Sequence, residues 1–365
     1  MLRVGIVGLP NVGKSTLFNA LTLQHGSGQA HAAAANFPFT TVDPNLGVVT
    51  VPDERLDRLA NFSHSEKVVP TTIEFVDIAG LVKDAHAGAG LGNQFLSHIR
   101  EVDAIVEVVR FFPTSDVIHV TGHVDPVHDT ETTNTELALA DLQTAEKMLE
   151  RTQRDARSGE RALIRRAETL GKIRAALADG APARNLTLTP QETETIRDVH
   201  LLTRKPLLYL ANLDHAQMRQ APEILAAFPA QYRPVVPLSV QIEQELSELP
   251  TADRATFLAE YGLDHSGLDD LIGAAYTLLG LVTFFTTGPK ETRAWTVARG
   301  STAPTAAGKI HSDFERGFIR AETIPWNTLV AAGSYAAART RGLLRDEGKE
   351  YVVRDGDVFI FKTSV

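Results

Sequence analysis

Apolar positions along the chain fall into short runs separated by longer amphipathic stretches. Four runs are almost continuous in apolar or β-branched residues, which is typical of buried strands, and they cover residues 4–7, 72–76, 206–211 and 235–238. The stretches at residues 16–21 and 93–101 predict helices. Strands that alternate with helices in this way predict an α/β domain.

A helical segment interrupts this alternation between about residues 134 and 202. Apolar residues recur at helical spacing around residues 137–149 and again around residues 163–177. Thr189, Pro190 and Glu192 then supply the N-cap, first-turn proline and capping-box acid of a third helix. We expect an antiparallel helical (coiled-coil) domain inserted into the α/β domain.

The pattern changes again from about residue 283. Alternating residues predict strands at 292–297 and 358–361, and short helices are expected around Glu315 and at residues 328–339. This region predicts a small α+β module of the β-grasp type. The expected division is therefore an α/β domain at residues 1–133 and 203–280, a helical insert at residues 134–202, and a C-terminal module at residues 281–365.

The composition agrees with a protein of several domains and excludes some classes of protein. The chain has 365 residues, which is long for one compact core. No apolar run approaches the roughly 20 residues of a membrane span. Without cysteine, disulfides, thiolate nucleophiles and cysteine-based zinc sites are excluded. The first strand leaves no room for a signal peptide, so we expect a cytoplasmic protein. A net charge of −9 argues against coating of nucleic acid by the whole surface, but local basic patches remain compatible with it.

The segment Gly8–Thr16 is a complete G-x-x-x-x-G-K-[ST] phosphate loop, placed between a predicted strand and a predicted helix. Its backbone N–H groups are suited to hold nucleotide phosphates, Lys14 to reach the β- and γ-phosphates, and Ser15 to ligate Mg²⁺. A chance match is the alternative, but the strand–loop–helix context disfavours it. We expect a nucleoside triphosphate to contact Asn11, Val12, Gly13, Lys14, Ser15 and Thr16.

Two further segments narrow the class of nucleotide-binding protein. Asp77 ends the strand at residues 72–76, where an acid can hold Mg²⁺ through its water shell, and the Gly80 N–H can approach the γ-phosphate. Residues 36–45 contain Thr40 and Thr41, and we favour Thr41 as the Mg²⁺ ligand that senses the γ-phosphate. A simple connecting turn is the alternative for that segment.

Water activation needs a group other than the usual glutamine, because Leu81 stands where Ras-like proteins carry it. Asn11 is one candidate, since its side-chain oxygen can hold a monovalent cation such as K⁺ beside the phosphates. The others are histidines, His86 or His119, with His98 less favoured.

The base-recognition segment departs from the GTPase pattern. GTPases carry Asn-Lys-x-Asp, whereas this chain has Asn212, Leu213, Asp214 and His215. Guanine loses its carboxylate partner unless Asp214 turns toward it, so adenine becomes at least as acceptable. Ser239 and Val240 form the last loop over the base.

Basic residues are concentrated in two places. In the insert they recur every three or four positions and are expected to share a helix face, which is either solvated or a docking stripe for RNA or protein: Arg151, Arg154, Arg157, Arg161 and Arg165. In the C-terminal module they suggest a surface that faces nucleic acid or the ribosome: Lys290, Arg293, Arg299, Lys309, Arg316 and Arg320.

Taken together, these motifs resemble the YchF family of Obg-related, ribosome-binding ATPases. The resemblance covers essentially the whole chain and rests on Gly8–Thr16, Asn36–Phe39, Asp77–Val82, Gly90–Phe95, Asn134–Leu137, Arg293–Thr296 and Ala307–Glu322. It implies a P-loop G domain, an inserted helical domain and a C-terminal TGS domain. It also implies that Leu81 is the family's hydrophobic replacement of glutamine.

The resemblance further implies slow hydrolysis, acceptance of ATP and association with the ribosome. By position it makes Ser15 and Thr41 the Mg²⁺ ligands, and it favours His119 over His86. Two features depart from the family: His215 stands where the family has an acid, and the segment 23–35 is longer than usual.

We therefore expect a Mg²⁺-dependent nucleoside triphosphatase that prefers ATP to GTP and acts as a switch on the ribosome, with its large subunit and ribosomal RNA as contacts. Lys14, Gly80 and His119 are its candidate catalytic groups, and Asp77 joins Ser15 and Thr41 at the metal. The alternatives are an Obg-type GTPase, or a nucleotide-tuned ribosome- or RNA-binding module with negligible turnover.

Overall fold

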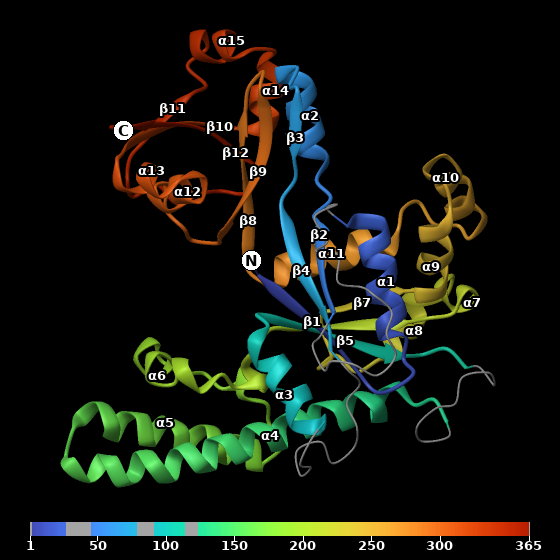
Figure 1. The fold of residues 1–365 in the computed structure, drawn as a ribbon, viewed down its shortest axis with the longest axis vertical. Coiled ribbons are helices and arrows are strands. Elements are labelled where there is room, and N and C mark those ends of the chain that lie inside the picture. Colours follow the sequence, from blue (N-terminus) through green and yellow to red (C-terminus); the bar gives the residue numbers. More distant parts are fainter. Residues whose placement is uncertain (1, 27–44, 79–90, 114–122, 365) are drawn as a thin grey trace. The chain divides into compact units, whose positions relative to one another are not determined.

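The computed structural model describes residues 2–26, 45–78, 91–113 and 123–364. The chain divides into two compact units, and Figure 1 shows the elements of each. The first unit comprises Met1–Val48 and Glu74–Leu271, and the second comprises Val49–Ile73 and Ile272–Val365. Both units are discontinuous in sequence, because the segment 49–73 leaves the first and packs in the second.

A sheet with strand order β2-β4-β1-β5-β6-β7 forms the centre of the first unit. The pairs β4-β1, β1-β5, β5-β6 and β6-β7 are parallel, so their carboxyl ends meet at one edge. The strands are β1 (Arg3–Val7), β2 (Asn45–Thr50), β4 (Thr72–Asp77), β5 (Ala104–Arg110), β6 (Leu207–Asn212) and β7 (Val235–Leu238). All four strands expected from the apolar runs are confirmed, and together with the helices they give the expected α/β class.

The helices around this sheet follow the strands in sequence. They are α1 (Lys14–His25), α3 (Leu91–Glu101), α7 (His215–Met218), α8 (Ala221–Ala227), α9 (Val240–Glu248), α10 (Thr251–Glu260) and α11 (Gly267–Leu278). Among the helices that the structure describes, none is both long enough and apolar enough to cross a membrane.

The insert is a helical hairpin, as expected. Its two long helices, α4 (Pro126–Asp155) and α5 (Arg161–Ala178), pack side by side and antiparallel (Figure 1). Shorter elements complete it: η1 (Ala156–Ser158), η2 (Ala183–Asn185), α6 (Pro190–Thr195), η3 (Arg197–Val199) and η4 (Leu202–Arg204). At α6 the expected capping box is present: Thr189 Oγ1 accepts from the Glu192 N–H at 3.2 Å, and Glu192 Oε2 accepts from the Thr189 N–H at 2.8 Å.

Two details of the insert differ from expectation. The boundary expected at residue 134 falls inside α4, which begins eight residues earlier under the Asp125 N-cap. The five arginines expected on one helix face also do not share one, because α4 ends at Asp155 and α5 begins at Arg161. Gly159, with φ of 82°, turns the chain between them. The spacing of three or four residues between the arginines therefore runs across a turn, and residues on opposite sides of a turn do not share a helix face.

A buried aspartate of α4 binds the segment in which the chain leaves the insert. Asp141 of α4 is 1 % exposed and accepts hydrogen bonds from the Leu202 N–H at 2.8 Å, the Thr203 N–H at 2.7 Å and the Thr203 hydroxyl at 2.6 Å. These contacts join the middle of α4 to the segment that leads into β6. The return of the chain to the central sheet is therefore fixed by one carboxylate.

The second unit is built on a mixed sheet with strand order β11-β10-β12-β8-β9-β3. Its strands are β3 (Lys67–Val69), β8 (Leu281–Thr287), β9 (Glu291–Ala298), β10 (Phe318–Pro325), β11 (Arg345–Glu347) and β12 (Asp357–Thr363). Its helices are α2 (Glu54–Ser63), α12 (Ala303–Ile310), α13 (Ser312–Arg316), α14 (Trp326–Ala332) and α15 (Tyr335–Thr340). This arrangement has the expected α+β character. The helix expected at residues 328–339 is two helices, because Gly333, with φ of 78°, ends the first.

Residues 49–73 were expected in the nucleotide domain but pack with the C-terminal sheet. Leu56 and Leu59 of α2 join the hydrophobic cluster of Phe285 and Leu329. On the same helix, Arg55 donates to Asp355 at 2.5 Å. The apolar face of α2 therefore finds its partners more than 200 residues away in sequence, which chain order alone does not reveal.

Candidate active site

The phosphate loop lies where the sequence predicted, between the end of β1 and the start of α1. Three of its residues have positive φ: Gly8 (144°), Asn11 (62°) and Gly13 (101°). A Cβ on Gly8 would lie 2.5 Å from the Val108 carbonyl oxygen, so no side chain fits there. A loop of this conformation at the start of α1 is suited to an anion, because a helix N-terminus presents unpaired N–H groups and positive partial charge.

Lys14 is the first residue of α1 and is only 8 % exposed. Its Nζ donates to the Leu9 carbonyl of the same loop at 2.8 Å. Burial lowers the pKa of Lys14 to about 8, although the nearby Asp77 carboxylate acts in the opposite direction. The ammonium is therefore held inside the loop, and a bound phosphate would add negative charge to that of Asp77.

Ser15, Thr16 and Asp77 complete the phosphate end of the site. Ser15 is exposed and Thr16 half-buried on the first turn of α1, while Asp77 is the last residue of β4 and aligns with Ile6 of β1. A hydroxyl and a carboxylate are hard oxygen donors, and Mg²⁺ is commonly held by one or two such groups together with substrate phosphates. These donors are of the kind that Mg²⁺ takes, and the roles of Ser15 and Asp77 as metal ligands stay predictions.

Asn212 links the phosphate loop to the base-recognition loops. It ends β6, is 4 % exposed, donates from Nδ2 to the Val12 carbonyl at 2.9 Å and accepts from the Val240 N–H at 3.1 Å. The next residue, Leu213, donates its N–H to the Leu238 carbonyl at 2.9 Å. A Cβ on Gly13 would lie 2.8 Å from Asn212 Nδ2, so this glycine allows the contact. The structure thus brings together segments that the sequence places 200 residues apart.

The two residues after Leu213 have different surroundings. Asp214 is the N-cap of α7: its carboxylate accepts from the Gln217 N–H at 2.7 Å, and Gln217 Oε1 accepts from the Asp214 N–H at 3.0 Å. His215 is exposed, with its ring 6.0 Å from that of Tyr261 in an edge-to-face arrangement. The only carboxylate of this motif is therefore engaged in a helix cap, and the position that guanine recognition requires carries an imidazole.

Ser239 and Val240 follow β7, as expected. Ser239 is 3 % exposed, and its hydroxyl has no hydrogen-bond partner within the described structure. The remaining predicted site residues, Thr41, Gly80 and His119, lie outside the described residues, as do Thr40, Leu81 and His86. Their roles stay predictions. His98 is described, and it is half-buried on α3.

Sequence reasoning missed two buried ionisable residues on β5, the strand that pairs with β1. Glu107 on β5 is 1 % exposed, and burial raises its pKa to about 8. Arg110, at the end of the same strand, is also 1 % exposed, and its guanidinium lies 4.4 Å from the Phe112 ring centre. The sequence does contain a signal for them, since Glu107 and Arg110 stand in an otherwise apolar seven-residue strand. Charged residues at such positions are buried only at a cost in free energy, which marks them as unusual.

A parallel sheet with a phosphate loop after β1, an acid at the end of β4 and an asparagine loop after β6 defines a P-loop nucleoside triphosphatase with a G-type domain. The chain is 48 % identical over all of its length to the ribosome-binding ATPase YchF of Bacillus subtilis, and the match covers 100 % of that protein. It is 47 % identical to the protein of that name from Escherichia coli O157:H7, covering 100 % of this chain and 99 % of the relative. The chain belongs to the YchF family.

Family models and a solved structure agree with this assignment. Residues 3–153 match a model described as 50S ribosome-binding GTPase, and residues 281–364 match the YchF-GTPase C-terminal model, described as a protein of unknown function. The solved structure of the Schizosaccharomyces pombe YchF GTPase superposes with a TM-score of 0.85 at 36 % identity, covering 99 % of this chain and 97 % of that one. The similarity therefore extends over both units.

The lowered pKa of Lys14 predicts a pH dependence of nucleotide binding. In the nucleotide-free protein, Lys14 has a pKa of about 8, and a bound phosphate favours the charged form of its side chain. Affinity for ATP should therefore be full below that pKa and fall above it, by up to about tenfold per pH unit. Calorimetry at about pH 9 in two buffers of different ionisation enthalpy should show uptake of close to one proton per ATP. A flat affinity across this range would contradict the prediction, and Lys14→Gln should abolish the dependence.

Proposed function

We propose that this protein is a cytoplasmic, Mg²⁺-dependent ATPase that prefers ATP to GTP, hydrolyses it slowly and acts as a nucleotide switch on the large ribosomal subunit. Relatives of nearly half identical sequence bear the name ribosome-binding ATPase, which supports the activity and the partner. The observation that carries the base preference is the engagement of Asp214 in the cap of α7.

The base preference follows from hydrogen-bond satisfaction. Guanine presents N1–H and N2–H₂ donors, and a buried donor without an acceptor costs about 1–3 kcal/mol. With the Asp214 carboxylate in a helix cap and an imidazole at residue 215, no carboxylate of this motif remains for guanine. Adenine carries no such pair of donors on its corresponding edge. ATP therefore binds without this cost, whereas GTP binding includes it.

The phosphate end supplies the transition-state stabilisation. Lys14, whose ammonium already lies in the loop, would contact the β- and γ-phosphates. Ser15, Thr41 and Asp77 would hold Mg²⁺, which would supply positive charge to the phosphate oxygens. Gly80 donates its N–H to the γ-phosphate. Asn11 would hold K⁺, which would supply positive charge in the place of an arginine finger, and His119 would orient the attacking water.

Ribosomal RNA is the proposed contact of the C-terminal (TGS) module. Its basic side chains include Arg293, which lies 4.3 Å from the Trp295 ring centre, and Arg316, which pairs with Asp313 at 2.7 Å. A guanidinium held on an indole ring is preorganised for phosphate or for stacking on a base.

Equilibrium titration of ATP and GTP, with Mg²⁺ and with or without K⁺, tests the base preference. ATP should bind at least about tenfold more tightly, which corresponds to about 1.4 kcal/mol. GTP binding more tightly by that margin would make the protein an Obg-type GTPase. Single-turnover hydrolysis on ribosomes tests the activity: a rate at background would leave a nucleotide-tuned binding module.

A further inference from the structure

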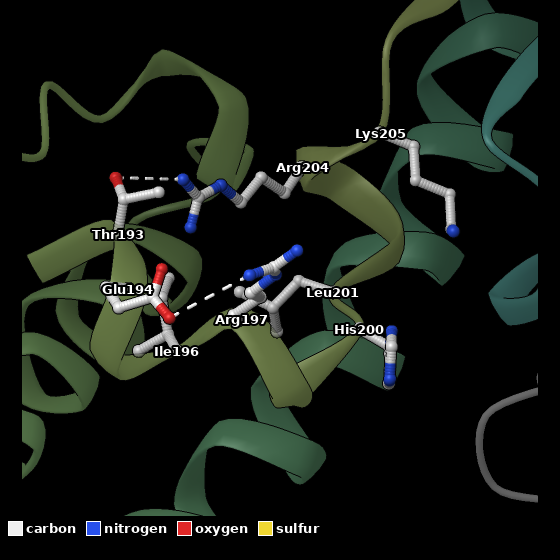
Figure 2. A pocket seen from close by; sticks show the side chains of 8 residues that line it. All are labelled: Thr193, Glu194, Ile196, Arg197, His200, Leu201, Arg204 and Lys205. Carbon is white, nitrogen blue, oxygen red and sulfur yellow. Dashed lines mark hydrogen bonds and ion pairs between the residues drawn. The ribbon is translucent and has the colours of Figure 1, made fainter. Parts of the chain in front are cut away.

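A basic cavity lies in the insert, on the segment between α6 and β6. It has a volume of about 340 Å³. Figure 2 shows its lining residues, which are Thr193, Glu194, Ile196, Arg197, His200, Leu201, Arg204 and Lys205. Ile196 and Leu201 contribute apolar side chains that are only 3 % and 4 % exposed. Arg197, His200 and Arg204 supply basic side chains from one short stretch of chain.

The two arginines keep donor capacity for an incoming anion. The Arg197 side chain is 82 % exposed and faces Glu194 at 3.9 Å, which is a weak ion pair in water. Arg204 donates to the neutral Thr193 hydroxyl at 3.1 Å and forms no ion pair within the part of the chain that the structure describes. Both contacts are drawn in Figure 2.

Neighbouring acidic residues do not neutralise the positive charge of the two arginines. Asp198 is bound by both guanidinium nitrogens of Arg166, at 2.7 and 2.9 Å, so its charge is already compensated. The Lys205 ammonium donates to the carbonyl oxygens of Arg100 and Val102 and points away from the two arginines (Figure 2). The cavity is therefore net positive in a chain whose net charge is −9.

The backbone of this segment is held before any ligand binds. Ile196, Val199 and Leu201 belong to the buried core of the insert. The capping box at Thr189 and the contacts of Asp141 to Leu202 and Thr203 fix the two ends of the segment. Because the backbone is already fixed, binding would cost only the conformational freedom of the arginine side chains.

We propose that this cavity binds a phosphodiester group of RNA, with Arg197 and Arg204 as the contacts and His200 at the rim. The proposal rests on the proposed function, because the ribosome supplies the RNA. Guanidinium groups match phosphate oxygens in a two-pronged geometry. A lipid surface would require exposed apolar side chains to insert, and the apolar residues of this cavity are buried.

The test is the salt dependence of ribosome binding by the full-length protein. In the double variant Arg197→Gln with Arg204→Gln, the slope of log affinity against log salt, measured between about 50 and 200 mM, should become shallower by about 2. Affinity at the lower salt should fall at least about tenfold. ATP affinity and the melting temperature should stay unchanged. Arg174→Gln is the matched control, since this exposed arginine of α5 does not line the cavity.

A second variant separates charge from structure. Thr193→Val removes the hydrogen bond to Arg204 and keeps both charges, so it should bind ribosomes like the unaltered protein. An unchanged slope in the double variant, or an equal loss in Arg174→Gln, would overturn the proposal. A loss of affinity without a change in slope would indicate a protein contact and would also overturn it.

Failure of the proposed function gives a different result. In that case the unaltered protein would not bind ribosomes at any salt concentration. A single-stranded RNA oligonucleotide would then replace the ribosome as the probe. RNA binding that the double variant loses would support the cavity as an RNA site, and equal binding by both proteins would exclude it.

Discussion

Lys14→Ala is expected to lower single-turnover hydrolysis of ATP by about 10²–10³-fold, the range observed when one charge-stabilising donor is removed from an active site. The ammonium is already in the loop, 2.8 Å from the Leu9 carbonyl, so no other side chain is needed to place it. Rapid-quench measurement with enzyme in excess over ATP isolates the chemical step from product release.

The fold should survive this substitution. Lys14 is buried and its pKa is lowered by burial, so the charged form costs free energy in the empty site. Removing it should leave the melting temperature of the nucleotide-free protein unchanged or slightly raised. Lys172→Ala, which removes an exposed lysine of α5, is the control. A loss of rate of less than about threefold in Lys14→Ala would refute the assigned role.

His215→Asp is expected to shift base selectivity toward guanine. The substitution supplies a carboxylate at the position that guanine recognition requires, and hydrogen bonds to charged groups contribute about 1.5–3 kcal/mol. The ratio of GTP to ATP affinity should therefore rise by about 10–100-fold. Competition titrations of both nucleotides against one fluorescent analogue measure this ratio directly. His215 is exposed, so the change should not affect folding.

Asp214→Asn is the companion variant, because asparagine also serves as an N-cap. If the Asp214 carboxylate acts only in the cap of α7, this variant should keep the nucleotide preference of the unaltered protein. A fall in GTP affinity would instead show that Asp214 reaches the base. An unchanged ratio in His215→Asp would mean that residue 215 does not face the base edge.

Local signals predicted where the described motifs lie in the fold. The phosphate loop, the acid at the end of β4 and the asparagine at the end of β6 each follow an apolar strand, and chain order suffices to place them at one sheet edge. The cap by Asp214 was also accessible from sequence, since Asp214 and Gln217 have the spacing of a capping box. The double contact of Asn212 was not, because it joins Val12 to Val240 across the fold.

Long-range packing explains what sequence reasoning missed. Residues 49–73 look like the continuation of the α/β domain, yet Leu56 and Leu59 are buried against residues of the C-terminal sheet. The arginine spacing between Arg151 and Arg165 looked like one helix, but the chain reverses at Gly159. In both cases the local pattern predicted the secondary structure of a few residues correctly. Which residues then pack together depends on tertiary contacts that the local pattern does not contain.

The 30-residue α4 begins beside the central sheet and ends at the tip of the insert without a break. Asp141 anchors the middle of this helix to Leu202 and Thr203, which lead into β6. The arms on either side are each about 20 Å long, so each degree of rotation about Asp141 moves either end by about 0.4 Å. A displacement of the first turn would therefore reach the distal end of the hairpin at about the same size and in the opposite direction.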